Sequence, residues 1–192
     1  MKNNLSNLSG GQKILQHKCR VTVIDKKCYK DLQAKYLADP ESGECPFYKI
    51  GDTFIFERYD DKDDFWREGN GSQCAEAWDC ISRYIYVALQ GGSIMRNWTN
   101  DERLMIACCN DGTRPVIFKI ERIDYKVLYI SGINNELDNK KIIDSLMKIN
   151  GIDSINIKAK FIEAILSDKN ISDEAIINAV ESAGNYKVLQ VE

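Results

Sequence analysis

All seven cysteines of this chain lie within its first 109 residues, and the remainder of the 192 residues contains none. No two of them have CxxC spacing, which argues against a zinc ribbon or zinc finger. An odd number of cysteines without a secretion signal predicts reduced thiols rather than a disulfide framework. Thiol chemistry is therefore expected only in the first part of the chain. The cysteines are Cys19, Cys28, Cys45, Cys74, Cys80, Cys108 and Cys109.

Four of these thiols lie at the ends of expected elements, where binding sites are commonly assembled. Cys45 lies in a loop before a proline, and Cys74 directly precedes a predicted helix, whose free N–H groups favour a thiolate. Cys108 and Cys109 close a predicted strand, so they should point to opposite faces and one should be buried. If Cys45, Cys74 and one of this pair converge, the thiolates would suit zinc, copper(I) or an iron–sulfur centre. The alternative is that the cysteines are buried small hydrophobes.

Groups for acid–base catalysis are few. His17 is the only histidine and lies in the polar leader, so neither a catalytic nor a ligand role is expected for it, and a Cys–His pair in the folded part is excluded. The remaining candidate bases near the cysteines are Glu76, Asp79 and Asp111. Each of these carboxylates is more simply explained as a solvated surface group.

The part of the chain that carries the cysteines, residues 18–124, is predicted to be a small α+β domain with a β-hairpin. Asn110-Asp111-Gly112-Thr113 is the hairpin turn between two apolar runs. The acidic stretch 60–72 is expected to be mobile unless Phe65 and Trp66 anchor it. Strands are predicted at 19–24, 53–57, 104–109 and 114–122, and helices at 29–38 and 75–89, the latter ended by Gly91-Gly92.

Several short motifs of this domain occur in a fixed order along residues 19–123. In this respect the segment resembles a family of small bacterial cysteine-containing proteins, and the resemblance implies a domain but no particular activity. The motifs are Cys45-Pro46, Gly51-Asp52 before a strand, Cys74 to Trp78 at the start of a helix, and Met105 to Gly112 followed by Arg114-Pro115-Val116.

Residues 125–192 are predicted to form a second domain with the element order βαββαβ, which is the ferredoxin-like plan. A strand at 125–131 precedes a helix that Asp138 can cap and that runs to about residue 150. Residues 154–166 contain two short strands on either side of Lys158-Ala159-Lys160. Ser172 begins a second helix, and 186–191 is the last strand.

This second domain resembles the heavy-metal-associated domain of metallochaperones and metal-pump tails, over residues 126–191. The resemblance rests on Gly132-Ile133 after the first strand, Asn150-Gly151-Ile152 before the second, and the run from Glu181 to Tyr186. The family's metal loop has two cysteines three positions apart, and this chain has Asn135 and Asp138 there. Soft copper(I) requires thiolates, so the resemblance implies a degenerate domain that has kept its scaffold for docking or dimerisation.

Charge and hydropathy narrow the classes of function. Residues 1–124 contain 18 basic and 19 acidic groups, and residues 125–192 contain 8 and 10. Without a basic stripe we expect no nucleic-acid partner. Without an apolar run of about 18 residues we expect no membrane span. The polar residues 1–17 lack a signal core and are expected to be a disordered leader of a cytoplasmic protein.

The function that the sequence favours is a cytoplasmic two-domain binding protein. Its first domain would bind a metal or small ligand, or sense redox state, through Cys45, Cys74, Cys108 and Cys109. Its second domain would contact a protein partner. Two alternatives remain: a cysteine- or metal-dependent enzyme with Cys74 or Cys45 as the thiolate, and a structural or interaction protein with buried thiols.

Overall fold

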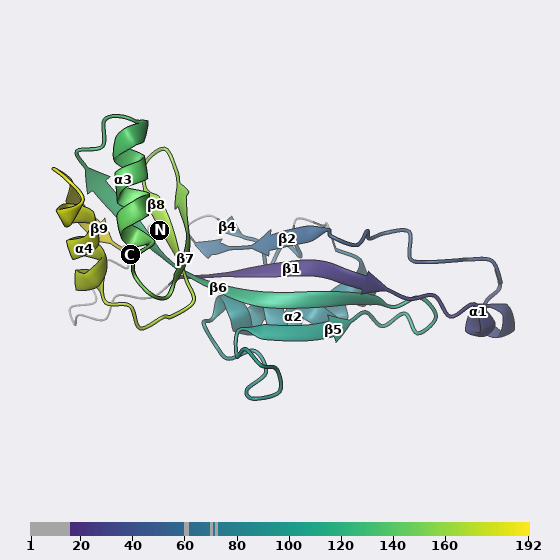
Figure 1. The fold of residues 1–192 in the computed structure, drawn as a ribbon. Helices are drawn as coiled ribbons and strands as arrows, with labels where there is room; N and C mark the ends of the chain where they lie inside the picture. Colours follow the sequence, from purple (N-terminus) through teal and green to yellow (C-terminus); the bar gives the residue numbers. More distant parts are fainter. Residues whose placement is uncertain (1–15, 60–61, 70, 72) are drawn as a thin grey trace, which may run out of the picture. The chain divides into compact units, whose positions relative to one another are not determined.

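The computed structural model describes residues 16–59, 62–69, 71 and 73–192, which form a mixed α/β structure (Figure 1). One compact unit comprises His17–Asp124, and a second contains Tyr125–Glu192. The boundary between the units falls within a single strand, β6 (Val116–Ser131). No helix in the described residues is long and apolar enough to cross a membrane.

The first unit contains four strands of a seven-stranded sheet and one principal helix. Its strand order is β2-β1-β6, with β5 on the other side of β6, and both β1–β2 and β5–β6 are antiparallel. Strands β3 and β4 form a separate short antiparallel pair. The elements are β1 (Gln16–Lys26), α1 (Lys30–Tyr36), β2 (Thr53–Phe56), β3 (Arg58–Tyr59), β4 (Lys62–Asp63), α2 (Ala75–Leu89), β5 (Leu104–Cys108) and the first part of β6.

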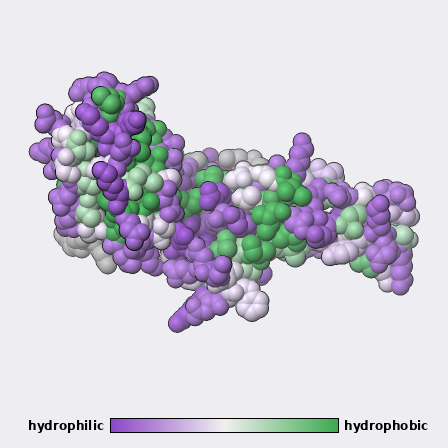
Figure 2. Space-filling view, in the orientation of Figure 1, coloured by the Kyte–Doolittle hydropathy of each residue, from purple (hydrophilic) through white to green (hydrophobic). Residues whose placement is uncertain are grey.

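One face of this sheet is buried in a core with α2. Alternate residues of β1, such as Val21 and Val23, pack in that core with Ile81 and Ile85 of α2, as expected for the period-two pattern of a strand and the apolar stripe of a helix. The opposite sheet face exposes Ile24, Ile55 and Ile106. Figure 2 shows hydrophobic residues gathered over β1, β6 and β5. Among the described residues of this unit, α2 therefore covers one face of the sheet.

The second unit has the element order βαββαβ that the sequence predicts. Its strands lie in the order β9-β6-β8-β7, with β6–β9 and β7–β8 antiparallel. Its core joins Leu128 and Ala164 of the sheet with Ile142 of α3 and Ile176 of α4. After β6 the elements are α3 (Glu136–Leu146), β7 (Ile152–Ile157), β8 (Ile162–Leu166), α4 (Asp173–Ser182) and β9 (Lys187–Val191).

The predicted strands 114–122 and 125–131 are one strand. The prediction ends one strand at residue 122 and begins the next at 125, where it also divides the two domains. In the structure Arg122 and Asp124 are both buried in β6, and Arg122 Nε donates to Asp124 Oδ1 at 2.7 Å. Since the two charges neutralise each other, β6 continues through them.

Two other boundaries differ from the prediction. Strand β1 begins at Gln16, so His17 belongs to a strand and not to the predicted leader 1–17, of which residues 1–15 lie outside the described residues. The first helix of the second unit begins at Glu136 with Asn135 as its N-cap, whereas Asp138 was predicted to be the cap. The helix begins earlier because the Asn135 side chain accepts the Asp138 N–H.

Candidate thiol site

The amino end of α2 is capped by a cysteine. Cys74 is the N-cap residue, its backbone is extended, and its side chain makes no capping hydrogen bond. Its own N–H is donated to the Tyr48 hydroxyl at 2.9 Å. A helix N-terminus without a capping side chain retains N–H groups and a positive dipole end, which favour a negative charge. The Cys74 thiol lies at this end, half-buried.

Tyr48 joins the loop that carries Cys45 to the start of α2. Its ring is only 2% exposed and packs edge-on against Phe118, with centroids 5.3 Å apart. Its hydroxyl donates to Gln73 Oε1 at 3.2 Å. Burial, with smaller contributions from the charges of Cys74, Cys45 and Cys109, raises the pKa of Tyr48 to about 12. Cys45 and Cys74 are partly buried and pack against the core that contains Tyr48 and Cys109.

Cys108 and Cys109 have opposite environments, as the strand pattern predicted. Cys108 is exposed, whereas Cys109 is buried and its Sγ accepts the Val116 N–H at 3.3 Å. Cys109 is thus the core member of the pair.

Cys80 is the site residue that the sequence reasoning missed. Its thiol donates to Asn110 Oδ1 at 2.8 Å, and the Asn110 N–H is donated in turn to the Glu76 carbonyl. Burial raises the pKa of Cys80, and Cys108 and Cys109 raise it further. No spacing in the sequence could have found it, because Cys74 and Cys80 are six positions apart and do not share a face of the helix.

The other two cysteines are separate from this cluster in role. Cys19 is fully buried in the core, and burial raises its pKa strongly. Cys28 donates to Gln33 Oε1 at 3.6 Å.

The carboxylates considered as bases have structural or solvated positions. Glu76 and Asp79 are exposed on α2. Asp111 closes the hairpin turn, where its Oδ1 accepts the Thr113 N–H and its Oδ2 accepts from Arg114 Nε, both at 2.9 Å. Although partial burial opposes ionisation, these bonds hold the pKa of Asp111 below its usual value. Nothing at these three positions adds support to the enzyme alternative.

Within the described residues no group of three or more histidine, cysteine, aspartate or glutamate side chains is arranged to hold a metal ion. The common site at Cys45, Cys74, Cys108 and Cys109 stays a prediction. Tyr48 and Cys109 belong to one hydrophobic core, and Cys45, Cys74 and Cys80 are partly buried side chains packed against it.

In the second unit, the loop before α3 has hydrogen-bonded polar side chains at the positions where the resemblance locates a metal site. Asp138 Oδ2 accepts the Asn134 N–H at 3.0 Å, and Asp138 Oδ1 accepts from the Tyr186 hydroxyl at 2.9 Å. Asn135 in turn caps α3. These are reciprocal bonds of the capping-box kind. Both residues at the positions of the family's cysteines therefore stabilise the loop itself.

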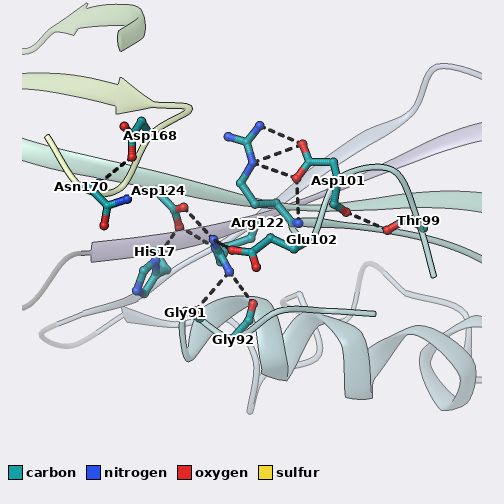
Figure 3. A network of polar contacts seen from close by, with 11 residues as sticks. His17, Gly91, Gly92, Thr99, Asp101, Glu102, Arg122, Asp124, Asp168 and Asn170 are labelled. Carbon is teal, nitrogen blue, oxygen red and sulfur yellow. Dashed lines mark hydrogen bonds and ion pairs between the residues drawn. The ribbon is translucent and has the colours of Figure 1, made fainter. Parts of the chain in front are cut away.

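A buried polar network lies at the carboxyl end of α2 (Figure 3). Arg122 Nη1 donates to the carbonyls of Gly91 and Gly92 at 3.1 and 2.6 Å, a favourable place for a cation because helix carbonyls there lack partners. Asp124 holds Arg122 and lies 2.8 Å from His17 Nδ1. Burial opposes ionisation, yet His17 and Arg122 hold the pKa of Asp124 below its usual value. The network fastens α2 to β1 and β6.

Comparison with known proteins does not assign the chain to a family. No protein-family model matches the chain, and no curated protein matches it. Among solved structures, a copper binding domain from HMA7, a P-type ATPase, is similar over 35% of this chain and 96% of its own, with 17% identity and a TM-score of 0.31. A likeness of this size carries no argument about what the chain does.

Proposed function

We propose that the chain is a two-domain binding protein whose N-terminal domain, residues 18–124, captures a thiophilic metal ion through its clustered cysteines. The observation that supports the proposal is Cys74 at the uncapped end of α2, with Cys45 and Cys74 packed against the core that contains Tyr48 and Cys109. A thiolate at that position is stabilised by the helix dipole, and thiolates are the ligands that soft cations select.

Among the metals considered, copper(I) fits this arrangement best. Structural zinc and iron–sulfur centres take about four protein ligands. Copper(I) is satisfied by two thiolates, which Cys45 and Cys74 could supply without a third group. The ferredoxin-like C-terminal domain, residues 125–192, is the interaction module of this proposal. The reduced thiols require a reducing compartment, which the cytoplasm provides.

The test is an anaerobic titration of the full chain with copper(I) against a chromophoric copper(I) chelator. Wild-type protein should compete for the ion, and Cys45→Ser and Cys74→Ser should each weaken binding at least tenfold. Cys28→Ser is the matched control, because that half-buried thiol contacts Gln33 instead. Wild-type protein with seven titratable thiols and no competition for copper(I) would refute metal capture.

An oxidant arm separates metal capture from redox sensing. The protein is treated with diamide and its free thiols are counted by mass spectrometry after alkylation. If Cys45 and Cys74 become disulfide-linked at low oxidant while copper(I) binding is absent, the cluster is a redox sensor instead. If Cys28→Ser weakens copper(I) binding as much as Cys74→Ser does, the assigned ligands are wrong.

A further inference from the structure

The segment after β4 is held against α2 by one aromatic ring. Phe65 packs against Trp78 and Tyr86 of α2, with ring centroids 5.5 and 5.1 Å apart. Trp66, the next residue, also contacts Phe65, yet it remains 69% exposed. The sequence left open whether both residues anchor this stretch. Phe65 does so, and Trp66 is presented to solvent.

Trp66 and Tyr86 together hold a guanidinium group. The Arg58 Cζ atom lies 6.0 Å from the Trp66 ring centroid and 5.9 Å from that of Tyr86. These distances are at the limit for a cation–π contact. Asp63 Oδ2 accepts from Arg58 Nε at 3.1 Å and orients the guanidinium. We call Trp66, Tyr86 and Asp63 the guanidinium clamp, with Arg58 as its internal occupant.

Arg58 should leave the clamp more easily than a buried core residue leaves its contacts. The Arg58 and Asp63 side chains are 27% and 34% exposed, so their ion pair is weakened by solvent. Tyr86 is also partly exposed. Large exposed aromatic side chains that gather on one surface are characteristic of interaction sites. The same three groups would accept a second guanidinium with the same geometry.

The carboxylate of the clamp defines the charge of the partner. Residues 57–68 contain six acidic and three basic side chains, although Glu57 and Asp64 are buried. Asp63, which pairs with Arg58, repels anionic ligands, including nucleic-acid phosphates, and attracts cationic ones. Arginine suits the clamp better than lysine, because its planar guanidinium stacks on aromatic rings and pairs with a carboxylate at the same time.

We propose that the guanidinium clamp is a docking site for an arginine-bearing basic segment of a partner protein, and that Arg58 occupies it in the free protein. The partner's arginine takes the place of Arg58 between Trp66 and Tyr86 and pairs with Asp63. Because Arg58 competes for the clamp, it lowers the fraction of molecules that can bind. The role of this surface does not depend on the cysteines.

The experiment measures binding of a fluorescein-labelled hexa-arginine peptide to the full chain by anisotropy. Trp66→Ala should weaken binding about tenfold, the loss of a partly desolvated cation–π contact. Arg58→Ala should do the opposite and tighten binding about threefold or more, because the internal competitor is gone. Trp98→Ala is the matched control, since Trp98 is likewise exposed, at 76%, and should change nothing.

Arg58→Gln is a second variant that keeps a hydrogen-bond donor for Asp63, in case Arg58→Ala disturbs the segment, and melting by circular dichroism verifies folding. It should also tighten binding. The proposal is overturned if either folded Arg58 variant binds the peptide more weakly, if Trp66→Ala leaves binding unchanged, or if hexa-lysine binds equally well. Stronger binding of oligo-dT than of hexa-arginine would assign the surface to single-stranded nucleic acid instead.

Discussion

The helices α2 and α3 begin in opposite ways. At α3 the N-cap is Asn135, whose side chain accepts the Asp138 N–H, while Asp138 reaches back to the Asn134 N–H. At α2 the N-cap is Cys74, which makes no capping hydrogen bond with its side chain. At α3, side chains of the first turn and the loop accept the free N–H groups. At α2, the thiol of Cys74 lies at the positive end of the helix dipole.

This difference explains why the two units suit different tasks. A capping box removes the N–H groups that would otherwise stabilise an anion or a ligand, so α3 contributes stability and an ordered loop. The end of α2 gives up that stability, because the Tyr48 hydroxyl accepts the N–H of the N-cap residue Cys74 itself. Three tests change one helix end or its loop at a time, and they are ordered by expected effect.

The largest effect is expected at Gly132, which begins the loop before α3. Its φ is +92°, and a Cβ there would overlap the Asn185 carbonyl oxygen. Gly132→Ala should therefore destabilise the chain by at least about 2 kcal/mol. Urea unfolding monitored by circular dichroism measures this loss of stability. Gly112→Ala is the control, because a Cβ at Gly112 meets nothing within 4 Å and should leave the midpoint unchanged.

Exchanging the caps should change stability in opposite directions. Asn135→Ala removes a working cap and should cost about 1 kcal/mol. Cys74→Ser adds a hydroxyl that can accept an α2 N–H, so it should raise stability by up to about 1 kcal/mol while it removes the thiol. Both are measured by thermal and urea unfolding. Equal destabilisation by the two variants would show that the ends do not differ as described.

The smallest effect is a difference in acid sensitivity. The Asn134 N–H first, and then the Tyr186 hydroxyl, hold the pKa of Asp138 below its usual value. Its folded pKa is thus below the unfolded value of about 3.9. The stability that ionised Asp138 contributes to the fold is present above its unfolded pKa and is lost as the pH falls through its folded pKa.

Asp138→Asn should therefore flatten the decline of the unfolding free energy below about pH 4 relative to wild type. Urea unfolding between pH 7 and pH 3 measures the two slopes. Asp79→Asn is the control, because Asp79 is exposed on α2. Parallel curves for Asp138→Asn and wild type would mean that the α3 capping contacts do not persist in solution.

Much of the secondary structure was determined by the sequence itself. The apolar stripe and Gly91-Gly92 located α2 at Ala75–Leu89, and Ser172 was recognised as the N-cap of α4. The hairpin of β5 and β6 and the βαββαβ order of the second unit were also predicted correctly. These features follow from periodicity and capping within a few residues, which are visible without knowledge of distant contacts.

Only the tertiary structure decided the features that depend on partners far apart in the chain. His17 was assigned to a leader because its partner Asp124 is 107 positions away. The continuity of β6 through Arg122 and Asp124 was not predicted, because their mutual neutralisation is invisible locally. Cys80 joined the thiol cluster through Asn110, 30 positions away. A single sequence records which groups are present, but burial and pairing across such distances arise only when the chain packs.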